Sequence, residues 1–234
     1  MDLIKEAGKF NIEISENQLE NLEKYEKILL EYNEVMNLTA ITDHEEVLEK
    51  HFLDSIALIS SEKLTEGCSL IDIGAGAGFP SMPVKIVRED INLTMLDSLN
   101  KRINFLNTVI DNLELKNAKA FHFRAEEGGK NKDLREKFDV ATARAVADLS
   151  VLAEYAIPFV KVGGYFVAMK GNAPEEEING AKKAIKEMGG QIEEVKEIVL
   201  PSGINHCLVI IKKIAPTPAK YPRKAGKPSK EPIL

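Results

Sequence analysis

From residue 68 onward, short apolar runs typical of strands alternate with longer stretches typical of helices, and this alternation constrains the fold more than any other feature. The strand-like runs lie at residues 68–73, 93–96, 118–123, 138–143 and 165–169. The helical stretches lie at residues 79–88, 99–113, 148–160 and 174–188. Strands that alternate with helices in this way form parallel, doubly wound sheets. We therefore predict an α/β fold with helices on both faces of the sheet.

The end of this pattern predicts how the sheet closes. The third helix is expected to end near the Gly163-Gly164 pair, because adjacent glycines break helices. After the last helix, two further apolar runs at residues 191–200 and 207–211 are joined by Pro201-Ser202-Gly203. A turn of this composition predicts a hairpin. The sheet should thus have seven strands, with the last one antiparallel.

The first 60 residues show helical patterns only. Ser15 and Gln18 have the spacing of a capping box at the start of an amphipathic helix over residues 16–36. Asp43 and Glu46 mark a second helix start that leads into the apolar stretch HFLDSIALI. We divide the chain into a helical extension (residues 1–62), an α/β domain (63–214) and a basic, Pro/Lys-rich tail (215–234).

Charge is distributed unevenly along the chain. The net charge is −6, but residues 212–234 carry seven lysines and arginines against Glu231 alone, which gives +6 there and −12 in the rest. Such a tail is either a solvated terminus or an arm that binds phosphates. The segment KYPRKAGKP, residues 220–228, combines an aromatic ring with cations, as binding to RNA requires.

A glycine-rich turn, DIGAGAGFP, directly follows the first strand. Gly74, Gly76 and Gly78 allow a ligand to approach the backbone, and the next helix offers free N–H groups. The spacing D-x-G-x-G-x-G differs from the G-x-G-x-x-G of dinucleotide-binding proteins, because Phe79 occupies the place of the third glycine. The turn therefore favours a nucleotide-like ligand without a pyrophosphate.

The ends of the next two strands suggest how this ligand is held. Asp97 ends the second strand about 20 residues past the turn, where a carboxylate accepts hydrogen bonds from both ribose hydroxyls. Asp97 also precedes a helix, so a role as helix cap is the alternative. Arg124-Ala125-Glu126-Glu127 follows the third strand, in the place where a loop commonly holds an adenine ring.

Composition excludes several other kinds of site. The two cysteines, Cys68 and Cys207, are too few for a disulfide framework or a Cys-rich zinc site. The histidines are scattered, and His44 and His51 are seven residues apart, too far to share a metal ion, so we expect no metal. His51 is kept as a possible pocket wall. The sequence shows no signal peptide or membrane span, and we expect a cytoplasmic protein.

Several segments together resemble one bacterial family. DIGAGAGFP, LDSLNKRINFL, RAEE, ARAVADL, AMKG and KYPRKAGKP, together with NLTAITDHEEVLEKHFLDSIAL upstream, are similar to the 16S rRNA guanine-N7 methyltransferases known as RsmG or GidB. The similarity runs in order over residues 30–228. This chain departs from the family where relatives often read GxPGxP after the turn, because it has Phe79-Pro80-Ser81-Met82-Pro83. We expect only local repacking there.

The resemblance implies a class I, Rossmann-like methyltransferase fold that uses S-adenosylmethionine. The implied cofactor-binding residues are Gly74, Gly76, Gly78, Phe79, Asp97, Ser98, Ala125, Glu126 and Arg144. Arg144, Lys170 and Arg124 are implied to orient the substrate at an RNA-facing rim. Lys220, Arg223, Lys224 and Lys227 of the tail are expected to contact RNA. The expected partner is 16S rRNA in the small ribosomal subunit, with no membrane contact and a monomeric enzyme.

Methylation of guanine N7 is consistent with the absence of a catalytic base from the sequence patterns of this chain. N7 has a free lone pair and loses no proton when it is methylated, so no general base is needed and no catalytic residue is assigned. Arg144-Ala145-Val146 stands where exocyclic-amine methyltransferases have an Asn/Asp-Pro-Pro-aromatic segment. Neither cysteine lies where it could attack a cytosine. Two rivals stay open: a small-molecule methyltransferase, and a non-catalytic ribosome-assembly factor that senses the cofactor.

Overall fold

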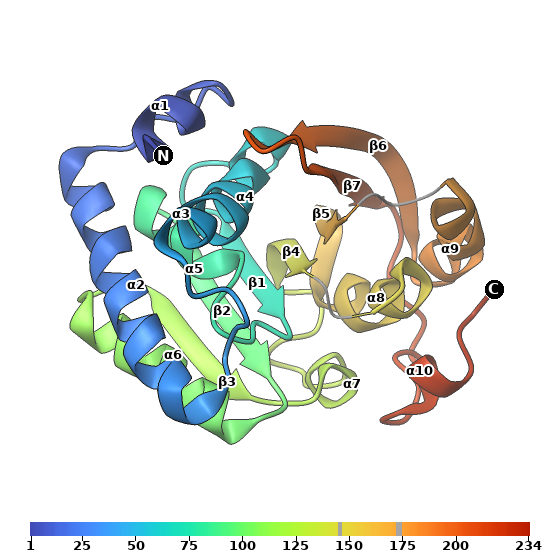
Figure 1. The fold of residues 1–234 in the computed structure, drawn as a ribbon. Coiled ribbons are helices and arrows are strands. Elements are labelled where there is room, and N and C mark those ends of the chain that lie inside the picture. The colour runs from blue at the N-terminus through green and yellow to red at the C-terminus, as the bar shows by residue number, and fades with distance from the viewer. Residues whose placement is uncertain (145–146, 172–174) are drawn as a thin grey trace.

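The computed structural model describes residues 1–144, 147–171 and 175–234 of the chain. Seven strands form one sheet in the order β3-β2-β1-β4-β5-β7-β6 (Figure 1). Their bounds are β1 Ser69–Ile73, β2 Asn92–Asp97, β3 Ala118–His122, β4 Phe138–Arg144, β5 Val160–Lys170, β6 Gly190–Val199 and β7 Asn205–Lys213. Strands β1 to β5 are parallel to one another, and β7 is antiparallel to both β5 and β6. The predicted seven strands, with an antiparallel last strand, are confirmed.

The helices follow the predicted alternation. Their bounds are α1 Leu3–Gly8, α2 Glu16–Met36, α3 His44–Glu46, α4 Asp54–Ile56, α5 Ser81–Val87, α6 Asn100–Asn112, α7 Ala125–Gly128, α8 Leu149–Ala156, α9 Glu175–Glu187 and α10 Lys227–Lys230. A π-helix, Val47–Leu53, and two 3₁₀ turns, Ala57–Ser61 and Ile157–Phe159, complete the set. The short helices α1, α7 and α10 were not predicted. Residue 174, the predicted start of the helix that contains α9, lies outside the described residues.

The caps that the sequence predicts for the N-terminal helices are present. The Ser15 side chain accepts a hydrogen bond from the Gln18 backbone N–H, and the Gln18 side chain accepts one from Ser15. The Asp43 carboxylate likewise accepts from the Glu46 backbone N–H. These bonds satisfy N–H groups that a helix start leaves without a partner. The prediction that the first 60 residues are helical is confirmed.

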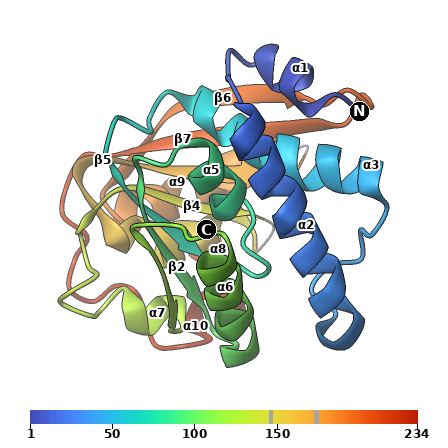
Figure 2. The same cartoon turned by 90° about the vertical axis from the view of Figure 1, so that its left-hand side faces the viewer.

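Each face of the sheet carries its own core, because side chains alternate between the two faces along a strand. Leu70 packs on the face covered by α1 to α6, and its neighbour Ile71 packs on the face covered by α8 and α9. The long helix α2 crosses the first face and contacts α5 and α6 (Figure 2). The helical extension therefore shares a core with the sheet, and its separation from the α/β domain at residue 62 stays a prediction.

The predicted role of the Gly163-Gly164 pair is wrong. Helix α8 and the 3₁₀ turn that follows it end at Phe159, close to the predicted end at residue 160, but Gly163 and Gly164 lie inside β5. The pairing of β4 with β5 shifts register between Phe138 and Val140, which marks a bulge. A Cβ atom at Gly164 would lie 2.4 Å from the backbone oxygen of Asp139. The glycines therefore allow β4 and β5 to approach closely, and they do not end a helix.

The C-terminal segment, residues 215–234, lies against the folded domain rather than extending into solvent. Tyr221 is buried and belongs to the core beneath α8. The guanidinium of Arg135 donates hydrogen bonds to the backbone oxygens of Thr217 at 2.7 Å and Tyr221 at 2.8 Å. This anchoring contradicts the interpretation of the segment as a solvated terminus.

Within the described residues, no helix is long and apolar enough to cross a membrane.

Candidate functional site

The glycine-rich turn lies at the carboxyl end of β1, between β2 and β4. The chain crosses from β1 to β2 on one side and reaches β4 on the other, and the carboxyl ends of strands at such a switch point are where α/β sheets bind ligands. Gly74 and Gly76 have φ angles of 74° and 61°, which favour glycine. Both line a cavity of about 400 Å³, here called the turn cavity. The prediction that the turn leaves room for a ligand is thus supported at these two positions.

Gly78 serves a different purpose from its two neighbours. It does not line the turn cavity. A Cβ atom there would lie 2.7 Å from the Tyr25 hydroxyl and 3.1 Å from Met82. The same hydroxyl donates to the backbone oxygen of Ala77. Gly78 therefore allows helix α2 to pack on the turn, and the predicted contact of Gly78 with the cofactor is not supported by its position.

Asp97 joins the turn to the end of β2. Its side chain is 2% exposed. One carboxylate oxygen accepts from the backbone N–H of Gly76 at 3.0 Å and faces Arg102 at 3.3 Å, and the other accepts from the N–H of Leu99 at 2.8 Å. Helix α6 has Leu99 as its N-cap without a side-chain cap bond, so Asp97 is not its cap. A carboxylate has about four acceptor sites, so these three contacts leave about one site for a ligand hydroxyl.

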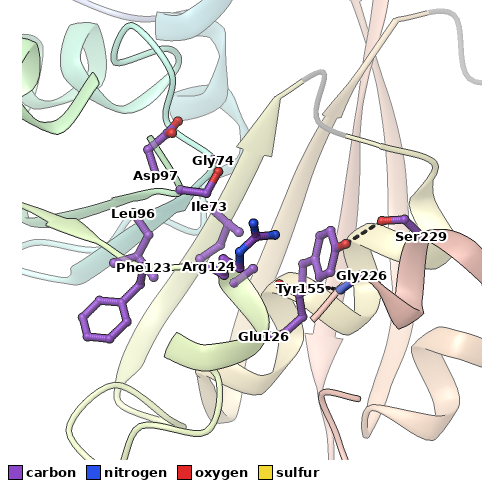
Figure 3. Close-up of a pocket in the computed structure, with 12 residues that line it drawn as sticks. Ile73, Gly74, Leu96, Asp97, Phe123, Arg124, Glu126, Tyr155, Gly226 and Ser229 are labelled. Carbon is purple, nitrogen blue, oxygen red and sulfur yellow. Dashed lines mark hydrogen bonds between the residues drawn. The ribbon is translucent and has the colours of Figure 1, made fainter. Parts of the chain in front are cut away.

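A second cavity of about 200 Å³ lies beyond Asp97, and we call it the C-terminal cavity (Figure 3). Its lining includes the predicted residues Ser98, Arg124, Ala125 and Glu126. Gly74, Asp97 and Ser98 line this cavity and the turn cavity alike, so the two are adjacent. Apolar walls come from Ile73, Leu96 and Phe123. A flat ring fits such walls, with polar atoms at one edge.

The C-terminal segment supplies the far wall of this cavity. The carboxylate of Glu126 accepts from the backbone N–H of Gly226 at 2.8 Å, and the hydroxyls of Tyr155 and Ser229 are 2.7 Å apart (Figure 3). Sequence analysis missed Tyr155, Gly226 and Ser229 as pocket residues. The two hydrogen bonds join residues 74 and 100 positions apart in the sequence, and no local pattern marks such a contact.

Phe79 and His51 form a stacked pair at the other end of the turn cavity. Their ring centroids are 4.3 Å apart with an angle of 13° between the planes. Burial, with a further contribution from Arg144, lowers the pKa of His51 to about 4. The ring is therefore neutral at pH 7. It bonds the Thr39 hydroxyl through Nε2 at 2.8 Å and faces Arg144 through Nδ1 at 3.4 Å. The possible role of His51 as a pocket wall agrees with its position.

Arg144, at the end of β4, lies above the Phe79 ring at 5.1 Å from the ring centroid. Its guanidinium donates to Asp54 at 2.8 Å and to the backbone oxygen of Lys50 at 3.2 Å. The carboxylate of Asp54 is buried and accepts both this bond and one from His206. Ala145 and Val146, which follow in the ARAVADL segment, lie outside the described residues. Arg144 thus joins β4 to the helical extension at the cavity edge.

A third cavity, of about 420 Å³, lies between these residues and the β6–β7 hairpin, and we call it the hairpin cavity. It is lined by Ile41, Lys50, His51, Asp54, Arg144, Met169, Lys170, Gly171, Ile204 and His206. His51 and Arg144 also line the turn cavity. The three cavities therefore form one row along the carboxyl edge of the sheet, with the turn cavity in the middle.

The structure separates two cations that sequence analysis grouped on one rim. Lys170 lines the hairpin cavity and is engaged by Glu177 and by the backbone oxygen of Ala147. Arg124 lines the C-terminal cavity and is exposed, and its guanidinium has no hydrogen-bond or ion-pair partner among the described residues. The two are therefore at opposite ends of the row and cannot contact one small group together.

The tail cations also fall into two classes. Arg223 is engaged with buried Glu154, which directs its charge inward. Lys220, Lys224 and Lys227 are exposed. Lys220 and Lys227 approach Glu187 and Glu231 only at 3.7 and 3.4 Å. Of the four residues predicted to contact RNA, these three lysines alone are free to reach a phosphate.

The two cysteines, which are the remaining candidates for covalent chemistry, line none of the three cavities. Cys68 precedes β1, at the opposite end of the strand from the turn, and burial raises its pKa to about 11. Cys207 lies within β7 and is buried. In the described part of the chain, no three His, Cys, Asp or Glu side chains are grouped to hold a metal ion. The site can therefore position a ligand by hydrogen bonds, stacking and charge.

Comparisons with known proteins agree with this arrangement. The model of the family described as rRNA small subunit methyltransferase G (GidB) matches residues 18–205. A protein named Ribosomal RNA small subunit methyltransferase G from Clostridium botulinum (strain Eklund 17B / Type B) is 50% identical, over 99% of this chain and 97% of its own length. The protein of that name from Alkaliphilus oremlandii is 53% identical, over 99% and 98%.

Solved structures are similar in fold at lower identity. A SAM-dependent methyltransferase from Aquifex aeolicus superposes with a TM-score of 0.55 at 18% identity, covering 74% of this chain and 94% of that one. This likeness confirms the predicted fold class.

Proposed function

Because this chain belongs to the rRNA small subunit methyltransferase G family, we propose that it transfers a methyl group from S-adenosylmethionine to N7 of a guanine in 16S rRNA. The observation that carries this proposal is the row of three cavities along the carboxyl edge of the sheet. A row of this kind accommodates a nucleoside at one end, a short flexible chain in the middle and an acceptor ring at the other end.

The residues of two cavities fit S-adenosylmethionine. Asp97 has about one unused acceptor site for a ribose hydroxyl, and Gly76 has open space, since a Cβ atom there would find its nearest neighbour at 3.9 Å. Ala125 and Glu126, with the apolar walls of the C-terminal cavity, would hold the adenine. Gly74 and Phe79 would border the methionine part. When bound, S-adenosylmethionine supplies an electrophilic methyl group on a positively charged sulfur.

The reaction at guanine N7 requires positioning rather than proton transfer. The N7 lone pair forms the new bond to carbon while the carbon–sulfur bond breaks, and its electron pair remains on sulfur. No proton leaves, so the neutral His51 at the junction of two cavities has none to accept. Arg144 and Lys170 border the acceptor end, where their role is to orient the RNA. The main contribution of the protein to the reaction is then to hold N7, the methyl carbon and the sulfur in line.

The exposed lysines of the C-terminal segment support an RNA substrate. Lys220, Lys224 and Lys227 lie on the segment that also walls the C-terminal cavity, so phosphate binding and cofactor binding involve one stretch of chain. A monomer is proposed because one chain lines all three cavities. Cytoplasmic placement and action on the small ribosomal subunit follow from the proposed rRNA substrate.

The experiment maps 7-methylguanosine in 16S rRNA from cells with and without the gene, and repeats the reaction with purified protein and isotopically labelled S-adenosylmethionine. We expect one guanine to lose its methyl group in the deletion strain and to regain it in vitro. Methylation of small molecules alone would favour a small-molecule methyltransferase. RNA binding with no label transferred would favour an assembly factor.

A further inference from the structure

An enzyme that methylates N7 has to distinguish guanine from adenine without using N7 itself. Both purines carry N7 with a free lone pair. They differ at N1 and C2, where only guanine has N–H donors, and at position 6, where guanine has an oxygen that accepts hydrogen bonds and adenine has an amino group that donates them. The usual bidentate contact of arginine to O6 and N7 would block the atom that reacts. A single donor aimed at O6 would distinguish the two bases and leave N7 free.

The hairpin cavity contains one side chain held in a suitable way, His206 at the start of β7. Its Nδ1 lies 2.7 Å from Oδ1 of Asp54, and the other oxygen of Asp54 accepts from Arg144 at 2.8 Å. The Asp54 side chain is 3% exposed, and that of His206 is 27% exposed. Among the described residues, Nε2 of His206 has no hydrogen-bond partner. The ring is thus fixed at one nitrogen and available at the other.

The bond to Asp54 determines what Nε2 offers to a ligand. A carboxylate can only accept, so Nδ1 carries a proton whether the ring is neutral or charged. In the neutral ring, Nε2 has a lone pair and complements the amino group of adenine. In the imidazolium, Nε2 carries a proton and complements O6 of guanine. Protonated His206 therefore favours guanine, and neutral His206 favours adenine.

We propose that the hairpin cavity receives the target guanine and that His206, anchored to Asp54 through Nδ1, donates a hydrogen bond from Nε2 to guanine O6. This inference rests on the proposed N7 activity and names the residue that selects the base. The cavity, at about 420 Å³, is within the 300–1,000 Å³ range of small-ligand pockets. Ile41, Met169 and Ile204 provide apolar surface for the ring.

The charges around His206 favour the imidazolium. The hydrogen bond to Asp54 raises the pKa of His206, while burial and Arg144 lower it, and the net direction is upward. The other ionisable residues of the cavity are Lys50, His51 and Lys170, of which Lys50 and Lys170 pair with Glu46 and Glu177. From β6, the residue opposite His206 is the apolar Ile198.

The test uses small ribosomal subunits reconstituted from 16S rRNA that carries either guanosine or 2,6-diaminopurine at the mapped position. Both bases keep N7, but the second has an amino group at position 6. We expect wild-type protein to prefer guanine, with a preference that falls as pH rises through the pKa of His206. His206→Ala should reduce the ratio of the two kcat/KM values by roughly tenfold. His206→Lys, a permanent donor, should keep the preference and remove its pH dependence.

His44→Ala is the matched control, because His44 pairs with a carboxylate, Glu26, outside all three cavities. It should leave the preference and its pH profile unchanged. If His206→Ala and wild type show the same ratio and pH profile while wild type still forms 7-methylguanosine, the inference is overturned and the proposed function stands. If wild type forms no 7-methylguanosine, both are overturned. If His206→Ala does not fold, the other two proteins test the inference. A wild-type preference that does not change with pH, or one that stays pH-dependent in His206→Lys, would overturn it.

Discussion

Arg223 in the C-terminal segment forms a two-sided ion pair with Glu154 in α8. The Arg223 guanidinium donates to one Glu154 oxygen at 2.7 Å, and its backbone N–H donates to the other at 2.6 Å. The Glu154 side chain is 1% exposed. Since Gly226 and Ser229 follow a few residues later and contact Glu126 and Tyr155, this pair determines where the wall of the C-terminal cavity lies.

Replacing Arg223 should therefore affect stability and cofactor binding together. Arg223→Gln leaves the buried carboxylate of Glu154 without its partner charge, which should lower the free energy of unfolding by about 3 kcal/mol. Affinity for S-adenosylmethionine should fall as well, because the cavity wall is released. Denaturant unfolding and calorimetry measure the two effects. The double variant Arg223→Gln/Glu154→Gln removes the unpaired charge and should recover stability; a loss of RNA affinity alone would contradict this assignment.

Neutralising the exposed lysines should affect RNA binding only. The triple variant Lys220→Gln/Lys224→Gln/Lys227→Gln removes three cations that can reach phosphates, whereas Arg223 keeps its inward pair. Single-stranded RNA shows a log–log salt slope of about −0.7 per phosphate neutralised, so the slope should fall in magnitude by about 2. Titrations at several salt concentrations give this slope. An unaltered slope would mean that these lysines do not touch phosphate.

Asp97→Ala should weaken binding of S-adenosylmethionine by about 1.5–3 kcal/mol, or roughly tenfold to more than a hundredfold. The variant loses the acceptor for ribose hydroxyls and also the bond that holds the Gly76 N–H. Calorimetry measures the affinity. Asp90→Ala is the matched control, because Asp90 also accepts from a glycine N–H and pairs with an arginine, but outside the three cavities. Equal affinities for the two variants would remove Asp97 from the site.

Asp72 should make the stability of the protein depend on pH. Burial raises its pKa from an ordinary 3.8 to about 7, and one of its carboxylate oxygens has no partner among the described residues. Between these two values the unfolded chain has released the proton and the folded chain still holds it, so stability falls as pH rises. Asp72→Asn should reduce this fall. Thermal unfolding at pH 4 to 8 tests it, and parallel curves for both proteins would contradict it.

Local patterns were sufficient for most of the fold. Strand and helix positions, the capping box at Ser15 and the hairpin at residues 201–203 depend on neighbours within a few residues, which the sequence displays directly. The role of Gly163-Gly164 was misjudged because a glycine pair ends a helix or admits a neighbouring strand equally well. Only the approach of Asp139 in β4 distinguishes the two.

The site residues also differ in whether local sequence could predict them. Local sequence was enough to predict the turn at Gly74 and Gly76 and the carboxylate of Asp97, because these lie at strand ends that must share one edge of a parallel sheet. The folded structure was needed to show that Gly78 packs against Tyr25, that Arg223 points inward to Glu154, and that His206 contacts Asp54 across 152 residues. Such pairs form where buried charges and close contacts find partners in space, and the order of residues along the chain carries no sign of them.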